Sequence, residues 1–310
     1  MTRMHPQPDI RPAIAAALAR GGAVVALEST LISHGLPYPE NIETALAMEA
    51  AVRDGGAEPA SVGIVDGRIR IGLTGSELAL FARSDTVRKT SRRDLAIVCA
   101  RGEHGATTVA ATMVCAWRAG IAVFATGGIG GVHRDVAATM DVSADLDELA
   151  RTPVAVVCSG AKAILDLPRT MQALETRGVP VIGYRTDFFP AFLVRSSGLA
   201  VDQRVAGAEE AAAIMHAHWA LGLGGGLIVA NPVPAEAAMD PAEIEAFIDQ
   251  ARSEADSLEV TGGAVTPFLL RRINEMTGNR SLLANVALLK DNASAAAEVA
   301  VAYARRAAAA

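Results

Sequence analysis

The sequence predicts a single α/β domain in which a largely parallel central sheet is flanked by helices. Short apolar runs rich in β-branched residues alternate with Ala-rich helical stretches, and strands without polar alternation are typical of a sheet covered on both faces. Hydrophobic residues make up 51% and charged residues 20% of the 310 residues, which is sufficient for a core of its own. No fixed-period repeat or long low-complexity linker divides the chain, so we expect one domain over residues 1–310.

The expected strands are apolar runs that each end at a glycine, a polar turn or a helix start. They cover residues 23–27, 95–99, 121–125, 154–158, 179–184 and 227–230. Residues 62–73 differ, because Asp66-Gly67 separates two alternating runs. Asp-Gly favours a type I′ turn, so we expect a small β-hairpin there, at an edge or in a subdomain.

Capping residues mark the helix starts. Thr74 and Glu77 have the spacing of a capping box, and Asp240-Pro241 followed by Glu243 supplies an N-cap, an N1 proline and an N3 carboxylate. Further helices are expected over residues 163–174 and 286–310.

Composition excludes several classes of function. The net charge is −6 and aromatic residues make up 4%, which argues against a surface for a nucleic acid polymer. Cys99, Cys115 and Cys158 lie in apolar runs, so we expect reduced core cysteines of a cytoplasmic protein. None of them has the Cys-x-x-Cys spacing of a zinc site. We expect no signal peptide, and the longest uncharged apolar stretch, 218–235, is too interrupted by glycine and proline to span a membrane.

Lysine is rare in this chain. Of the 28 basic residues only Lys89, Lys162 and Lys290 are lysines. A lysine that persists against an arginine bias points to a site that needs a primary amine able to lose its proton and attack a carbonyl. Chance is the alternative for any one of them.

Candidate chemistry is expected at the carboxyl ends of the strands, where ligands collect in parallel α/β sheets. Glu28 follows the first strand. It could be a general acid or base, or a structural partner of an arginine. The strand at 121–125 leads into Thr126 and a loop with four glycines in five positions before His133. Such a loop could cradle a phosphate, but it lacks the dinucleotide spacing, and a lone histidine is more often structural.

Lys162 follows the strand at 154–158 and precedes the helix expected over 163–174. Near a helix N-terminus the macrodipole disfavours the ammonium form, which suits an amine that forms a Schiff base. A surface lysine on the first helical turn is the alternative.

Two polar segments complete the candidates. Residues 141–148 concentrate carboxylates that suit Mg²⁺ or Mn²⁺, or that cap a helix. Residues 89–94 mix cationic side chains and hydroxyls. They could bind a phosphate monoester, or they could form a solvated charged loop.

Taken together, these segments resemble the pseudouridine-5′-phosphate glycosidases, a family whose relatives include the indigoidine synthase A-like proteins. The resemblance runs from about residue 12 to the C-terminal helix, with long motifs in the same order. They are ALESTLISHGLPYPEN at 26–41, SRRD at 91–94, GATTVAAT at 105–112, FATGGIGGVHR at 124–134, DVSADL at 141–146, TPVAVVCSGAK at 152–162, ANPVP at 230–234 and the region around Asn285.

The resemblance implies a role for each matching position. Glu28 would be the proton donor, Lys162 the nucleophile that forms a Schiff base with the sugar C1′, and Asp141 a ligand of Mn²⁺ (Mg²⁺ or another divalent ion is the alternative). The residues implied to contact substrate are Lys89, Val109, Ser143, Ala144 and Asp145, with Thr126, His133 and Asn285 for phosphate or uracil. Met140 and Asp135 depart from the family pattern near the metal loop.

The implied reaction is the reversible cleavage of the C–C glycosidic bond of pseudouridine 5′-phosphate to uracil and ribose 5-phosphate, by a homotrimer. Two other functions fit the same residues. A class I aldolase-type lyase on another sugar phosphate would also use Lys162 and Lys89, without dependence on uracil. A non-catalytic nucleotide-binding or pigment-pathway accessory protein would tolerate loss of Lys162. A dinucleotide dehydrogenase is disfavoured by the glycine spacing.

Overall fold

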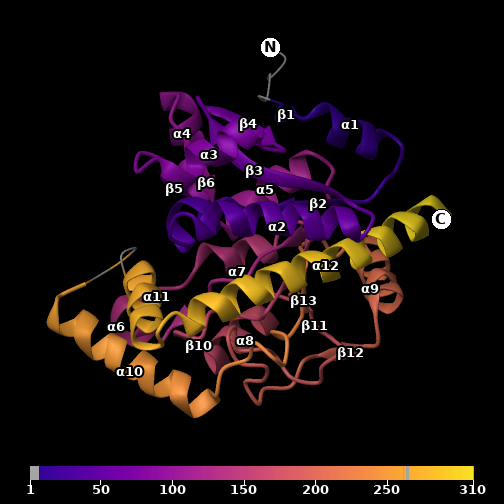
Figure 1. Ribbon diagram of the computed structural model, residues 1–310. Coiled ribbons are helices and arrows are strands. Elements are labelled where there is room, and N and C mark those ends of the chain that lie inside the picture. Colours follow the sequence, from indigo (N-terminus) through magenta and orange to yellow (C-terminus); the bar gives the residue numbers. More distant parts are fainter. Residues whose placement is uncertain (1–6, 261, 263–264, 310) are drawn as a thin grey trace.

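A mostly parallel sheet crosses the centre of the computed structural model, which describes residues 7–260, 262 and 265–309 (Figure 1). In the described part of the chain its strand order is β1-β4-β3-β2-β7-β9-β13-β11-β12, and β6 joins β5 to β3. The strands are β1 Asp9–Ile10, β2 Val24–Leu27, β3 Glu58–Val65, β4 Arg68–Ile71, β5 Arg88–Thr90, β6 Gly105–Thr107, β7 Val123–Ala125, β9 Ala155–Cys158, β11 Val181–Tyr184, β12 Gln203–Val205 and β13 Leu227–Ala230, with β8 Val132–His133 and β10 Leu165–Asp166 forming a separate antiparallel pair. The predicted fold class is confirmed.

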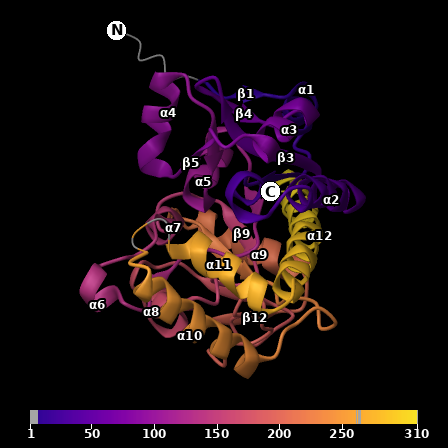
Figure 2. The same cartoon turned by 60° about the vertical axis from the view of Figure 1, so that its left-hand side comes forward.

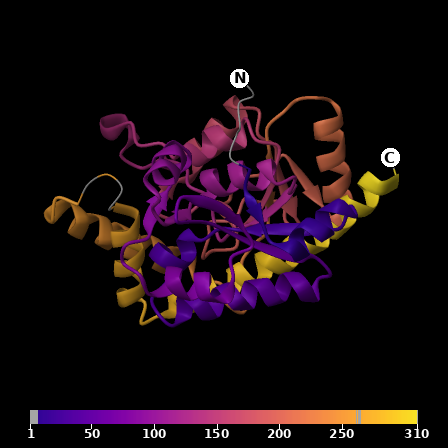
Figure 3. The same cartoon turned by 90° about the horizontal axis from the view of Figure 1, so that it is seen from above.

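Helices cover both faces of the sheet. The long C-terminal helix α12 packs on β2, β7 and β9 and against α2, which packs on β3, while α5 packs on β2, β3 and β7 from the other side (Figures 1 and 3). The helices are α1 Pro12–Ala19, α2 Glu40–Asp54, α3 Gly75–Arg83, α4 Leu95–Arg101, α5 Val109–Arg118, α6 Val136–Thr139, α7 Ala144–Leu149, α8 Leu167–Thr176, α9 Ala208–Ala220, α10 Pro241–Ser257, α11 Val265–Met276 and α12 Arg280–Ala309. Helices α10 and α11 pack on each other at the end of the molecule where α6 also lies (Figure 2).

Strand β3 takes part in two kinds of pairing. Its first half runs parallel to β2, and its second half, Val62 to Val65, runs antiparallel to β4. Asp66 and Gly67 connect β3 to β4 with φ angles of 49° and 71°, the left-handed geometry that a type I′ turn requires. The predicted hairpin is therefore confirmed, and it extends the parallel sheet on one side.

Two sequence-based predictions were wrong. Residues 95–99 form helix α4 instead of a strand, because Ser91 and Asp94 cap a short 3₁₀ turn before it and Gly102 ends it in a left-handed conformation (φ 66°). The helix predicted over 163–174 begins only at Leu167, because Asp166 accepts the N-cap hydrogen bond and Pro168 occupies the first turn.

The two helix starts predicted from capping residues are confirmed. Thr74 and Glu77 form a capping box at α3, and Asp240 caps α10 by accepting a hydrogen bond from the Glu243 amide. The helix predicted to begin at residue 286 starts six residues earlier, at Arg280, and its predicted last residue, 310, lies outside the described residues.

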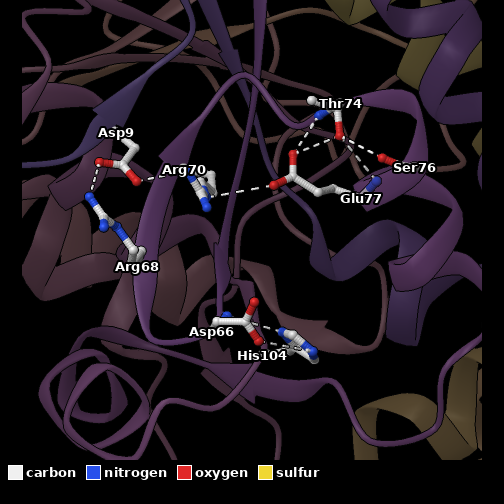
Figure 4. A network of polar contacts seen from close by, with 8 residues as sticks. All are labelled: Asp9, Asp66, Arg68, Arg70, Thr74, Ser76, Glu77 and His104. Carbon is white, nitrogen blue, oxygen red and sulfur yellow. Dashed lines mark hydrogen bonds and ion pairs between the residues drawn. The ribbon is translucent and has the colours of Figure 1, made fainter.

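A polar network fastens the hairpin to its neighbours (Figure 4). On β4, Arg68 and Arg70 each contact the Asp9 carboxylate at 2.7 Å, and Arg70 also lies 3.6 Å from Glu77 at the start of α3. Since such partly exposed pairs contribute little stability each, the network mainly fixes how β1 and α3 sit against the hairpin.

Two further expectations concern the environment of the chain. Cys115 and Cys158 are buried free thiols, and burial raises the pKa of each to about 12, so both stay protonated. Cys99 is free but only half-buried. Within the described ranges, no helix combines the length and the apolarity that crossing a membrane requires.

Candidate active site

A cleft of about 1150 Å³ opens at the carboxyl ends of β2, β7 and β9. All the residues that the sequence singled out for function line it, although they come from distant parts of the chain. They are Glu28, Lys89, Val109, Thr126, His133, Asp141, Ser143, Ala144, Asp145, Lys162 and Asn285.

Glu28 lies at the end of β2 with its carboxylate fixed by two threonines. The hydroxyls of Thr30 and Thr126 donate short hydrogen bonds to its two oxygens. Burial raises the pKa of Glu28, and the opposing effects of the Lys162 charge and of the threonine hydrogen bonds are smaller. A carboxyl group whose pKa is raised in a cleft is suited to act as a general acid.

Lys162 lies in the loop between β9 and β10, five residues before α8, so the helix-dipole argument for its amine does not apply. Backbone geometry holds it instead. Its N–H donates to the Ile129 carbonyl at 3.2 Å, and Gly160 has a φ of 74°, where a Cβ would overlap the Pro190 carbonyl oxygen. Close packing of the loop therefore fixes the backbone of Lys162, and the charge of its side chain acts on Glu28.

Lys89 reaches the same cleft from β5. Burial lowers the pKa of Lys89, and the nearby Lys162 charge lowers it further. Two lysines that act on each other and on one carboxyl group form the electrostatic centre of the cleft.

The glycine loop after β7 is built for close packing of protein groups. A Cβ on Gly128 would lie 2.9 Å from the Phe192 ring, and one on Gly130 would overlap Ser143. The amides of Ile129 and Gly130 already donate to the Gly160 carbonyl and to Asp145. Two of the amides in the loop interpreted as a phosphate cradle are therefore already paired within the protein.

The Asp145 carboxylate joins this loop to α5. Its two oxygens accept hydrogen bonds from the amides of Ala110 and Gly130, both at 2.9 Å. Ser143 caps α7, so part of the acidic segment 141–148 serves the helix start. Val109 and Ala144, the first residues of α5 and α7, line the cleft wall.

Asp141 is the candidate metal ligand, and His133 is its neighbour. Their closest side-chain atoms, Nε2 and Oδ2, are 3.8 Å apart. Among the described residues no three His, Cys, Asp or Glu side chains are grouped to hold an ion. This donor set fits a hard divalent ion that keeps most of its water and takes further oxygens from a substrate, the usual binding mode of Mg²⁺. Met140, beside Asp141, is 82% exposed with a φ of 57°.

Comparison with known protein families shows which family the chain belongs to. A family model described as indigoidine synthase A like protein matches residues 13–302. The chain belongs to this family.

Relatives of this indigoidine synthase A-like chain are similar over nearly its whole length. A protein of Methylobacterium nodulans named pseudouridine-5′-phosphate glycosidase is 58% identical, covering 96% of this chain and 88% of its own length. A protein of the same name from Caldanaerobacter subterraneus is 56% identical, covering 94% of this chain and 95% of its own length. Among solved structures, the prealnumycin C-glycosynthase AlnA, in complex with ribulose 5-phosphate, superposes with a TM-score of 0.92 at 40% identity, covering 99% of this chain and 100% of its own. An indigoidine synthase A-like protein of Thermotoga maritima superposes with a TM-score of 0.88 at 39% sequence identity, covering 97% of this chain and 98% of its own.

Sequence reasoning missed one residue that shapes the cleft of this indigoidine synthase A-like protein, Phe192, and did not pair two others that lie in its polar segments 89–94 and 141–148. The Glu148 side chain is fully buried and accepts hydrogen bonds from Arg92, at 2.6 Å, and from Thr152. Phe192 also lines the cleft, in a left-handed conformation with a φ of 61°. Arg92 lies within a predicted segment, whereas no local motif points to Phe192.

Proposed function

We propose that this chain is a pseudouridine-5′-phosphate glycosidase, which cleaves the C–C bond between uracil and ribose 5-phosphate reversibly through a lysine Schiff base. The observation that carries the proposal is the Lys162 amine acting on the Glu28 carboxyl group, whose pKa is raised, in a cleft at the strand ends. The names of the relatives that are 52–58% identical support the same activity.

The reaction needs an amine because the leaving group is a carbon. Glu28 gives its proton to the ring oxygen O4′ as the C1′–O4′ bond breaks, and the Lys162 nitrogen bonds to C1′. The proton that the Lys162 nitrogen loses on bonding returns to the Glu28 carboxylate. The nitrogen lone pair then forms C=N as the C1′–C5 bond to uracil breaks, and C5 takes up that proton from Glu28. Water adds to the iminium, releasing ribose 5-phosphate and the free amine.

The remaining cleft residues supply binding. Lys89 is proposed to pair with the phosphate of the substrate, since it is the second cation facing the Glu28–Lys162 pair. The backbones at Val109 and at 143–145, with the side chains of Thr126, His133 and Asn285, would make the other contacts with sugar, phosphate and base.

A divalent ion, Mn²⁺ or Mg²⁺, would be held by Asp141 through water, with His133 beside it. When bound, it supplies positive charge that favours the anionic substrate. A homotrimer in the cytoplasm, which the family resemblance implies, is part of the same proposal.

The test is release of uracil from pseudouridine 5′-phosphate in the presence of Mn²⁺. Lys162→Arg keeps the charge but cannot form an imine, so it should abolish release, and ribose 5-phosphate with borohydride should label the wild type only. Lys290→Arg, on α12 outside the cleft lining, is the matched control. Retained turnover or labelling in Lys162→Arg would refute the Schiff base.

The structural similarity to a C-glycosynthase favours one addition to the assay. Incubating uracil with ribose 5-phosphate should form pseudouridine 5′-phosphate, because the same steps run backwards. An aldolase-type lyase would instead cleave a sugar phosphate without regard to uracil, and an accessory protein would give no product at all.

A further inference from the structure

A buried amide network links three strand ends beneath the cleft. Its centre is Asn292 on α12, a fully buried residue that is outside the cleft lining. Its Nδ2 donates to the Thr126 carbonyl at 2.8 Å, and its two amide atoms lie 3.1 and 3.3 Å from the Ser159 hydroxyl. Its Oδ1 accepts a hydrogen bond from Asn231 at 3.0 Å. One side chain thus satisfies groups at the carboxyl ends of β7, β9 and β13.

Both candidate catalytic residues depend on the strand ends that this network joins. The Thr126 hydroxyl donates to Glu28, while its carbonyl accepts from Asn292. Ser159 begins the short loop that leads to Lys162. The distance between the proton donor and the nucleophile therefore depends on how β7 and β9 are fixed to each other at this depth.

We propose that Asn292 is a positioning residue that sets the placement of Glu28 relative to Lys162, acting through Thr126 and Ser159. The inference rests on the proposed function. A buried amide with both ends paired has one orientation, so it can hold two strand ends in fixed register, whereas an alanine leaves the Thr126 carbonyl without its partner. Small misplacements of reacting groups cost up to about 100-fold in rate.

The experiment compares Asn292→Ala with wild type for uracil release, at a temperature where circular dichroism shows both to be folded. We expect kcat to fall about 10- to 100-fold with KM changed less than threefold, because Asn292 does not line the cleft. Labelling by ribose 5-phosphate and borohydride should slow in parallel. The control is Asn274→Ala, which removes an amide that bonds Asn279 and Leu282 at the α11–α12 junction and should leave kcat unchanged.

If Asn292→Ala does not fold, Ser159→Ala decides, since it deletes one hydroxyl of the network and should lower kcat by a smaller factor without raising KM. A folded Asn292→Ala, or Ser159→Ala in its place, with wild-type kcat and labelling would overturn the inference. A wild type that releases no uracil would overturn the proposed function instead, so the two failures are distinguishable.

Discussion

The Thr126 hydroxyl donates a hydrogen bond to one carboxylate oxygen of Glu28. This bond joins the end of β7 to the end of β2 and opposes the effect of burial, which raises the pKa of Glu28. The threonine therefore limits the pH range over which the carboxyl group is protonated.

Replacing Thr126 by valine should move the pH dependence of the reaction. Glu28 is the proposed proton donor, so we expect activity to fall as the pH rises through its pKa. Without the hydroxyl, one interaction that lowers this pKa is lost, the pKa rises, and the fall should occur at higher pH. The measurement is kcat/KM for uracil release against pH. Thr277→Val, at the α11–α12 junction, is the control. A fall of kcat/KM at lower pH in Thr126→Val than in the wild type would contradict the assignment of this fall to Glu28.

Lys89→Gln should weaken binding of the phosphorylated substrate. The substitution removes a cation of the cleft while keeping a hydrogen-bonding side chain, so we expect KM for pseudouridine 5′-phosphate to rise about tenfold or more. Activity on unphosphorylated pseudouridine should change less. Lys290→Gln, which removes an exposed lysine on α12, serves as the control. An equal effect on both substrates would argue against a phosphate contact.

Removal of divalent ions should reduce turnover, and added Mn²⁺ should restore it. Asp141→Asn should then require a higher Mn²⁺ concentration for half-maximal activity, because a neutral amide holds a hydrated dication less well than a carboxylate. Asp187→Asn, at a carboxylate with 66% of its side chain exposed that pairs with Arg204, is the comparison. Full activity of the wild type in a chelator would exclude the metal requirement.

Gly160→Ala should destabilise the fold and impair the loop that carries Lys162. Its φ is 74°, and the added Cβ would overlap the Pro190 carbonyl oxygen, so we expect a loss of at least about 2 kcal/mol from strain and displaced backbone. Gly178→Ala has a similar φ of 68° but nothing within 4 Å of its Cβ, and should cost about 1 kcal/mol. Urea unfolding of both variants measures the difference, and equal losses would mean that the loop adjusts.

Local signals predicted much of the fold because their causes are local. The capping box at Thr74 and the Asp66-Gly67 turn need only neighbouring residues, and both are present. The run 95–99 shows the limit of this reasoning. Its apolar residues fit a strand or a helix equally well, and the caps on either side decide for a helix.

The candidate site was partly predictable for a different reason. Because parallel strands end on one edge of a sheet, Glu28, Thr126 and Lys162 could be expected to meet, and they line one cleft. What surrounds them could not be expected from the sequence pattern. Asn292 joins Thr126, Ser159 and Asn231, which lie 166, 133 and 61 positions before it, and no periodicity marks a buried amide.

Strand β3 pairs in parallel with β2 and antiparallel with β4 and β6. This arrangement places the proposed bond-making residues and the proposed phosphate-binding lysine on different parts of the sheet. The proposed bond-making residues, Glu28 and Lys162, follow β2 and β9. Lys89 is instead carried by β5, which in the described part of the chain pairs with β6 and through it with the antiparallel half of β3. Insertions or exchanges between residues 72 and 104 can therefore change which molecule is admitted while the chemistry stays in place. Divergence within this extension, from β4 to β6, would therefore alter how the phosphate of the proposed substrate is held and leave the residues that follow β2 and β9 in place.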